Sequence, residues 1–334
     1  MKKNKKILFL VVMILLLVTT GCTKQLKDAN GKVVTAKETK QVLIENIICQ
    51  PTELREDYEI ALAKKLKAYE KKYKAGDISK KEYEKKTNNI LDINILPKCK
   101  KISIVEGGYE TFWTSVFVKP LAWLIVKVGS FVKSYGLAII LITLLIKIVL
   151  FPFTNKSLKQ TENMKKAQPQ LNKIEKKYAN KTDQQSMMMK SNEMMAVYKE
   201  YGIKPLSSCL MAFIQIPLFF AFYEALYRLP ILFESKFIGL HMGMTPLAGA
   251  SAGHWYYLIL PVLVGLVTYF SFNMNKKGMA MGASDQTKQM SMMFNIMVVM
   301  IFVTSFSMST AIIIYWVTNS VLSVLQNIMV KRSK

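Results

Sequence analysis

Long apolar runs alternate with charged segments along this chain. Five runs stand out, at residues 135–153, 206–227, 255–272, 290–306 and 310–330. A helix needs about 20 apolar residues to cross a bilayer core of roughly 30 Å, and runs of 17 to 22 residues are close to that length. The pattern therefore predicts an all-α polytopic membrane protein with five transmembrane helices.

The first residues have the pattern of a bacterial signal peptide. Four lysines precede an apolar run at 7–18, which is too short to span a membrane, and Gly21 and Cys22 follow. A glycine directly before a cysteine resembles a lipoprotein cleavage site, so we expect residues 1–21 to be removed and Cys22 to be lipidated. Thr19 departs from that motif and leaves ordinary cleavage or an uncleaved anchor as alternatives.

Residues 22–108 are predicted to form an exported helical segment. One helix is expected from residue 53 to about residue 74, with Thr52 as its cap. A second helix is expected after Ser79, because Ser79 and Glu82 have the spacing of a capping box.

The chain has four cysteines, and two of them could form a disulfide within this segment. If Cys22 is acylated and Cys209 lies in a span, Cys49 and Cys99 remain as a pair in the exported segment. The sequence is equally compatible with a disulfide and with two free thiols, because it does not show how closely their Cα atoms approach.

Residues 109–133 are predicted to form an interfacial amphipathic helix. Lys119, Lys127, Lys133 and Pro120 would make a buried span costly, whereas a helix at the interface keeps its lysines in water and its aromatic rings at the headgroups. A true span here is the alternative, and it would invert the topology of everything that follows.

Residues 134–154 form the first predicted span, and residues 155–204 a cytoplasmic helical hairpin. The hairpin has eleven lysines and five acidic residues, with helical spacing on both sides of a turn at 180–183. Its charge suits anionic headgroups or ribosomal RNA. Its apolar residues, Leu171, Ile174 and several methionines, suit a helical partner. A solvated linker is the plainer alternative.

The loops between the four further spans, within residues 205–330, set the predicted orientation. The loop 229–253 has a single lysine, whereas 274–289 has three and the tail 331–334 is basic. Short basic loops stay in the cytoplasm, so the C-terminus is predicted to lie inside.

Lys147 lies within the first apolar run, where an ammonium group is costly. Its stem could snorkel to the nearer interface. Thr143 lies one helical turn earlier on the same face, however, and snorkelling alone does not require a polar stripe. We therefore regard Lys147 as a functional-site residue.

Composition and the motifs that are missing from the sequence argue against several classes of function. Of 334 residues 51% are hydrophobic, and 46 lysines and arginines against 22 acidic residues give a net charge of +24. No DNA-binding signature accompanies this charge. There is also no phosphate-binding loop, nucleophile–base pair or metal-ligand cluster, and His241 and His254 are isolated. We expect no enzymatic activity, no cofactor and no metal.

Four sequence blocks occur in a characteristic order from about residue 110 to the C-terminus. They read GLAIILITLLIKIVLFP, QTENMKKAQPQLNKIEKKY, YGIKPLSSCLMAFIQIPLFFAFYEAL and IIIYWVTNSVLSVLQ. In these blocks the chain resembles the YidC/Oxa/Alb family of membrane protein insertases, in its Gram-positive lipoprotein form. The resemblance implies five spans around a hydrophilic groove that is open to the cytoplasm and the lipid.

The resemblance also assigns residues to this groove. Lys147 corresponds to the family's groove arginine, and a lysine keeps the charge without the planar fork that binds a carboxylate through two hydrogen bonds. The other residues that the resemblance or their position assigns to the groove are Thr143, Gln215, Ser271, Trp316 and Asn319. An interhelical hydrogen bond for Gln215 and an interfacial position for Trp316 are the structural alternatives.

The resemblance implies an insertase of the bacterial cell membrane that receives nascent membrane proteins, alone or with the Sec translocon and the ribosome. Its N-terminus would be exported and lipid-anchored. A secondary transporter with Lys147 as the substrate counter-ion is the alternative, although the internal repeats common in transporters are not seen. A lipoprotein receptor whose exported segment is the active part is a third interpretation.

Overall fold

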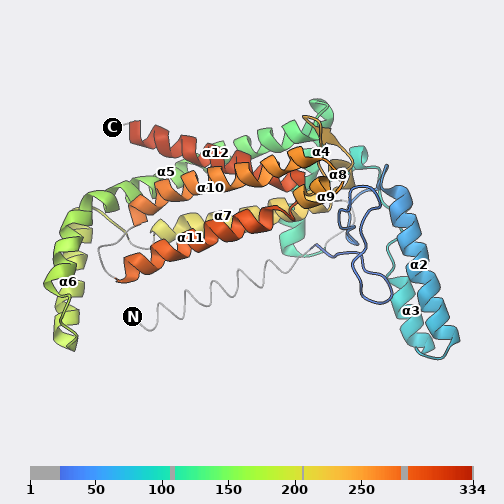
Figure 1. Ribbon diagram of the computed structural model, residues 1–334, viewed down its shortest axis with the longest axis horizontal. Coiled ribbons are helices and arrows are strands. Elements are labelled where there is room, and N and C mark those ends of the chain that lie inside the picture. Colours follow the sequence, from blue (N-terminus) through green and yellow to red (C-terminus); the bar gives the residue numbers. More distant parts are fainter. Residues whose placement is uncertain (1–22, 106–109, 205–206, 280–284, 333–334) are drawn as a thin grey trace. The chain divides into compact units, whose positions relative to one another are not determined.

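A computed structural model of the chain describes residues 23–105, 110–204, 207–279 and 285–332. The predicted signal peptide and Cys22 lie outside these ranges. Most of the described chain is helical (Figure 1). It divides into two units, which we describe one at a time. The first comprises the described residues up to Ile142 with Pro217–Leu258 and Ser307–Ile314, and the second Thr143–Ile216, Ile259–Phe306 and the residues from Tyr315 onward.

The first unit begins with an extended region rather than a helix. Residues 23–50 are held by the isolated antiparallel bridges Gln25–Ile44, Lys27–Val33 and Thr35–Val42. Ala29 and Asn30 form a turn that is closed by a hydrogen bond from the Gly31 N–H to the Asp28 carbonyl, and Gly31 has a φ of +83°, which glycine adopts without strain. The prediction that the whole exported segment is helical was therefore wrong for this part.

Two helices follow, α2 (Arg55–Lys74) and α3 (Lys80–Asn88). Ser79 caps α3 as predicted, and its side chain accepts a hydrogen bond from the Glu82 backbone N–H. Thr52 does not cap α2, which begins after Leu54 without a side-chain cap. The carboxylate of Glu234 instead holds the turn that leads into α2, because its Oε1 accepts from the N–H groups of Thr52 and Leu54 at 2.6 and 3.1 Å.

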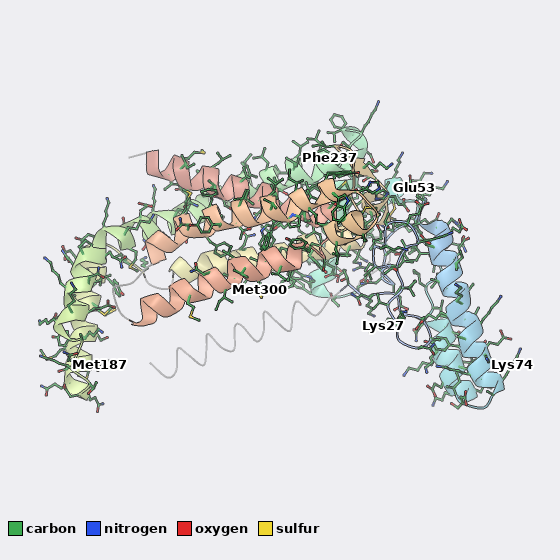
Figure 2. All side chains as sticks on the ribbon, in the orientation of Figure 1. Lys27, Glu53, Lys74, Met187, Phe237 and Met300 are labelled. Atoms are coloured by element: carbon green, nitrogen blue, oxygen red, sulfur yellow. A yellow bond between two sulfur atoms is a disulfide. The ribbon has the colours of Figure 1, made fainter. Side chains whose placement is uncertain are left out.

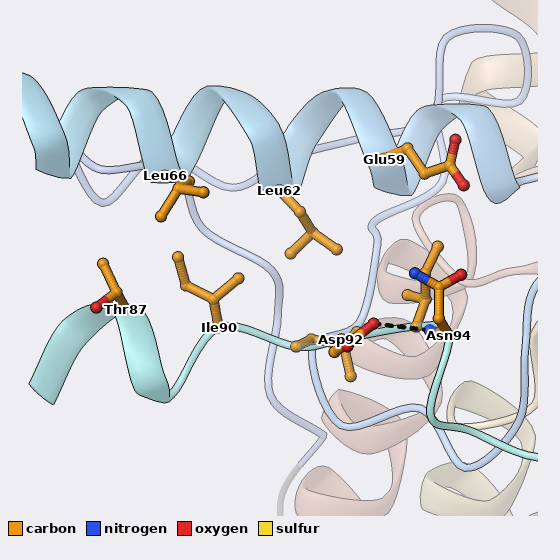
Figure 3. Close-up of a pocket in the computed structure, with 9 residues that line it drawn as sticks. Glu59, Leu62, Leu66, Thr87, Ile90, Asp92 and Asn94 are labelled. Carbon is orange, nitrogen blue, oxygen red and sulfur yellow. Dashed lines mark hydrogen bonds between the residues drawn. The ribbon is translucent and has the colours of Figure 1, made fainter. Parts of the chain in front are cut away.

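A disulfide joins Cys49 to Cys99. Cys99 begins the short 3-10 helix η1 (Cys99–Lys101). A small apolar pocket lies between α2 and the residues after α3. Figure 3 shows Leu62 and Leu66 of α2 pointing toward Ile90. None of the predicted groove residues lines this pocket.

The predicted interfacial region forms the π-helical turn η2 (Thr114–Val118) and α4 (Lys119–Phe131). Pro120 lies in the first turn of α4, where its missing N–H costs nothing. We expected Lys119 to lie in water. Only 4% of its side chain is exposed, however, and its Nζ lies 3.4 Å from Glu110. Residues 114–131 are long and apolar enough to cross a membrane, so the interfacial position stays a prediction.

Arg228 anchors the exported segment to the C-terminal end of α7 (Ser207–Tyr227). Its Nε donates to the Asn46 carbonyl at 2.7 Å, and its Nη atoms lie 2.7 Å from Glu110 and 3.3 Å from Glu224. The indole of Trp113 also donates to Glu224. The buried carboxylate of Glu224 is thereby paired with a cation, as burial requires, whereas Glu110 is exposed.

The loop after Arg228 contains short elements only. They are α8 (Pro230–Phe233), β1 (Lys236–Phe237), β2 (Leu240–His241), α9 (Pro246–Ser251) and η3 (Trp255–Leu258). The two strands pair antiparallel, with Lys236 opposite His241. The N–H groups of Thr310 and Ala311 donate to the carbonyls of Met244 and Met242, which fixes this loop to the start of α12 (Thr310–Arg332).

The first predicted span and the first arm of the hairpin form a single 43-residue helix, α5 (Tyr135–Lys177). Pro152 and Pro169 lie inside it without ending it. Asp183 caps α6 (Gln184–Glu200), which lies beside the C-terminal part of α5 (Figure 1). The helices pack through a core that consists of Met164, Ala167, Leu171, Val197, Tyr198 and Ile203, with Ile174, Met194 and Tyr201 at its edge. Leu171 and Ile174 are thus used inside the hairpin and are not free for a partner.

The other long helices are α7, α10 (Ile259–Met279), α11 (Asp285–Ser305) and α12. Within the described residues, stretches of α5, residues 255–274 and α12 are long and apolar enough to cross a membrane, in addition to residues 114–131. The residues of the predicted second and fourth spans form the helices α7 and α11, each of 21 residues, and their crossing of a membrane stays a prediction; within the described part of α11, Asn295–Ser305 forms a shorter apolar helix. Gly265 lets α10 approach α11 closely, because a Cβ there would lie 2.9 Å from the Phe302 ring.

Candidate functional site

A polar stripe runs along α5 inside the second unit. It consists of Thr143, Lys147, Thr154 and Thr161, which are spaced so that each returns to the same face of a helix with 3.6 residues per turn. The three threonines are 2 to 6% exposed, and Lys147 is partly buried. The apolar neighbours Leu145, Ile148 and Val149 are exposed, as expected for side chains that face lipid.

A second polar stripe runs along α12. Trp316, Asn319, Ser323 and Gln326 are spaced by three, four and three residues and therefore share one face. Gln326 is buried, and the other three are partly buried. The side-chain oxygen of Asn319 is buried and accepts no hydrogen bond from the described residues.

Two hydrogen bonds join the stripes. Lys147 Nζ donates to Ser323 Oγ at 2.8 Å, and Ser323 Oγ in turn donates to the Asn319 carbonyl at 2.8 Å. Gln326 Nε2 donates to Thr154 Oγ1 at 2.6 Å. Among the described residues no carboxylate forms an ion pair with Lys147, so its charge is held in place by a neutral hydroxyl.

Trp316 links the α12 stripe to α10. Its indole N–H donates to Thr268 Oγ1 at 2.9 Å, and Thr268 lies one turn before Ser271 on the same face. Thr268 and Ser271 are 1% and 9% exposed. Gln215 of α7 is partly buried and lies near Tyr315, the neighbour of Trp316.

The structure thus brings the predicted residues into two linked groups. Thr143, Lys147 and Asn319 belong to the junction of α5 and α12, and Trp316 and Ser271 to the junction of α12 and α10. The sequence analysis missed Thr154, Thr268, Ser323 and Gln326. All four lie at helical spacing from a predicted residue, so a search for polar residues in phase with Lys147, Ser271 and Asn319 would have found them.

The described residues include no group of three or more His, Cys, Asp or Glu side chains that could hold a metal ion. The stripes carry hydroxyls, amides, one indole and one ammonium. Such side chains can solvate a polar segment through hydrogen bonds and attract an acidic one through charge.

Comparison with known proteins identifies the family. Residues 127–334 match the family described as 60Kd inner membrane protein. The membrane protein insertase YidC of Oceanobacillus iheyensis is 34% identical over 242 residues, which cover 71% of this chain and 91% of the relative. The chain belongs to the YidC/Oxa/Alb family.

Other relatives have the same kind of name. The membrane protein insertase MisCA of Bacillus subtilis is 32% identical over 221 residues, which cover 66% of this chain and 79% of MisCA. A solved structure described as an active YidC insertase with its first transmembrane domain resolved is 24% identical, with a TM-score of 0.45, and the match covers 66% of this chain and 47% of that one.

Membership of this family shows the class of protein and favours one of the functions considered above. This YidC/Oxa/Alb protein is a multi-pass bacterial membrane protein, and its relatives favour an insertase over a secondary transporter. Insertases of this family are not enzymes, which agrees with the absence of a catalytic motif from the sequence. The family match begins at residue 127, so the predicted exported segment, residues 22–108, lies outside it.

Proposed function

We propose that this protein receives nascent membrane proteins along the polar stripes of α5 and α12 and releases their apolar helices into the lipid. The observation that carries the proposal is the position of Lys147. It lies in an apolar helix, is fixed by Ser323 and has no carboxylate partner among the described residues. A cation maintained in this way attracts the acidic residues of a polar segment that has to cross the membrane.

This process needs no external source of chemical energy. A polar segment loses its hydration as it enters hydrocarbon, and a hydrated groove that reaches part of the way shortens the apolar path. Buried hydroxyls and amides, such as Thr143, Gln326 and Asn319, can replace part of the lost hydration. Transfer of the apolar helix to lipid, at roughly 25 cal/mol per Å², then supplies the driving force.

Lysine in place of the family's arginine changes how a carboxylate would be held. A guanidinium binds a carboxylate through two parallel hydrogen bonds, whereas an ammonium is a compact point charge. Because one donor of Lys147 is used by Ser323, two remain for a substrate. We infer attraction by charge rather than recognition of shape.

We also propose the orientation and the anchoring. The Cys49–Cys99 disulfide supports an exported location for residues 23–105, because disulfides persist in oxidising compartments. Lipidation of Cys22 would then fix the mature N-terminus at the outer surface. The basic residues 331–334 support a cytoplasmic C-terminus, and the basic hairpin would lie on the same side. We further propose contacts of this hairpin with anionic lipids, the ribosome or the Sec translocon.

The proposal is tested by depleting the protein and following newly made membrane proteins. We expect single-span substrates with short acidic exported tails to remain accessible to protease on the cytoplasmic side. Re-expression of the wild-type chain should restore their insertion. Normal insertion of all membrane proteins during complete depletion, in a strain without a paralogue, would contradict the proposal.

A further inference from the structure

The hairpin of α5 and α6 leaves an apolar surface uncovered. Every large apolar side chain that is exposed in its described part, residues 155–204, is a methionine: Met187, Met188, Met189 and Met195 are 47 to 63% exposed. The leucines, isoleucines and valines of the same hairpin are buried or partly buried. Composition alone does not explain this separation, because Met164 is only 4% exposed and Met194 packs at the edge of the hairpin core.

The geometry of the hairpin explains why these methionines are uncovered. Lys177, the last residue of α5, pairs with Glu193 at 2.6 Å, so the first turns of α6 extend beyond the end of α5. Met187, Met188 and Met189 lie in those turns, and Figure 2 shows Met187 near the turn of the hairpin. Met195 is seven residues after Met188 and continues its face.

Methionine side chains suit a partner whose sequence varies. They are unbranched and polarizable, so they adapt to many shapes, and they are common at surfaces that bind many different helices. A single fixed partner would favour more rigid side chains. Exposed apolar patches off the membrane also cost solubility and usually mark binding sites.

The surrounding charge indicates the kind of partner. Residues 155–204 carry a net charge of +6, and Glu193 is already engaged by Lys177 and Tyr178. The same helix α5 carries Lys147 and the hairpin core, with Leu171 about 36 Å along the helix from Lys147 at 1.5 Å per residue. The methionines lie on α6, which packs against the hairpin part of α5, so the surface that they form is held at a fixed end of the helix that carries the polar stripe.

We propose that Met187, Met188, Met189 and Met195 form a docking surface for the apolar helix of a nascent membrane protein whose flanking residues are acidic or neutral. This inference rests on the proposed function and adds a first contact before the stripes of α5 and α12. The nascent helix lies across the methionines as an amphipathic helix lies in a groove, and the neighbouring lysines disfavour substrates with basic flanks.

Site-specific crosslinking in membrane vesicles tests this surface in the full-length protein. The substrate is a ribosome-bound nascent chain with one exposed apolar helix and a photoreactive probe within it. We expect crosslinks to α6 in the wild type and a loss of at least fivefold when all four methionines are replaced by glutamine, which has similar length. The fourfold replacement by leucine should retain crosslinking, because leucine remains apolar. The matched control replaces the exposed Ser191 and Asn192 of the same helix by glutamine and should behave like the wild type.

Two results would overturn the inference. One is wild-type crosslinking by the fourfold glutamine variant, and the other is crosslinking of the nascent helix to the ribosome or to other parts of this protein but not to α6. Lys147→Ala is assayed in parallel. If Lys147→Ala loses insertion while the glutamine variant docks and inserts normally, the docking surface is wrong and the proposed function stands. If the wild type itself inserts nothing, the proposed function fails.

Discussion

Substitution of Lys147 separates its charge from its geometry. An ion pair about 4 Å apart is stabilised by about 1 kcal/mol in water and about 4 kcal/mol at an effective dielectric constant near 20. We therefore expect Lys147→Ala to slow the insertion of substrates with acidic exported tails by roughly tenfold. Lys147→Arg should retain insertion, because it keeps the charge. Pulse-labelling with protease protection in a depletion strain measures both effects.

The matched control uses the substrate rather than the protein. The same single-span protein with a neutral exported tail should insert at similar rates with Lys147 and with alanine. Full activity of the alanine variant on the acidic tail would contradict a role for this charge.

Ser323 is predicted to be a positioning residue. Its hydroxyl accepts from Lys147 Nζ, and hydrogen bonds between membrane helices are worth about 0.6 kcal/mol on average, so Ser323→Ala should slow acidic-tailed substrates by roughly threefold. Ser323→Thr keeps the hydroxyl and should restore the rate. A purely structural role would instead affect neutral-tailed substrates equally, and that result would remove Ser323 from the site.

Single residues were predictable from the sequence only where their chemistry conflicted with their surroundings. Lys147 stands out because a cation in an apolar run is costly. Ser323 and Thr154 do not stand out, because hydroxyl side chains are common in membrane helices. They can donate a hydrogen bond to a backbone carbonyl of their own helix, as Thr154 does to Leu150. Their partners become visible only when α5 and α12 lie side by side.

At the scale of elements, we predict that the contact between Glu234 and the turn before α2 depends on pH. Burial raises the pKa of the Glu234 carboxyl, against the opposing hydrogen bonds from the N–H groups of Leu54 and Thr52. A raised pKa means that the folded protein keeps a proton that the unfolded chain has lost, so the stability of this contact falls as pH rises through the shifted pKa. The Glu234→Gln variant keeps an oxygen that can accept these hydrogen bonds, but it has no carboxyl group that titrates.

Hydrogen exchange at the N-terminus of α2 measures this effect across about pH 4 to 8. Protection should decline with rising pH in the wild type, after correction for the intrinsic exchange rate, and the Glu234→Gln variant should lose that decline. Glu56→Gln changes an exposed carboxylate in the first turn of α2 and should leave the decline in place. A wild-type profile without any decline would refute the role of Glu234.

The elements themselves were predictable to different extents. The Ser79 cap was correct because its partner Glu82 is three residues away in the sequence. The Thr52 cap was wrong because the turn before α2 is held by Glu234, which is about 180 residues away in the chain. The predicted boundary between the first span and the hairpin, at residues 154 and 155, does not interrupt the helix, because a change from apolar to polar residues does not by itself end a helix.

At the scale of the whole molecule, family membership gives the function but leaves the orientation of this chain to experiment. The disulfide between Cys49 and Cys99 and the basic C-terminal residues independently support an exported N-terminal segment and a cytoplasmic C-terminus. The interfacial position of residues 109–133 matters here, because one additional span at 114–131 would reverse the side of everything after it.

Cysteine labelling in intact cells decides the topology. Single cysteines are introduced at the exposed positions Lys37, Leu247 and Lys181 in a chain without Cys209, and Cys49 and Cys99 are left in their disulfide, which does not react. An impermeant maleimide should label positions 37 and 247 in intact cells and position 181 only after the membrane is opened. Labelling of position 181 in intact cells would show that the hairpin is outside.

A different pattern would show that residues 114–131 cross the membrane, namely labelling of positions 37 and 181 but not of position 247. An added span places the hairpin outside and the loop at 247 inside, while the N-terminal segment stays exported.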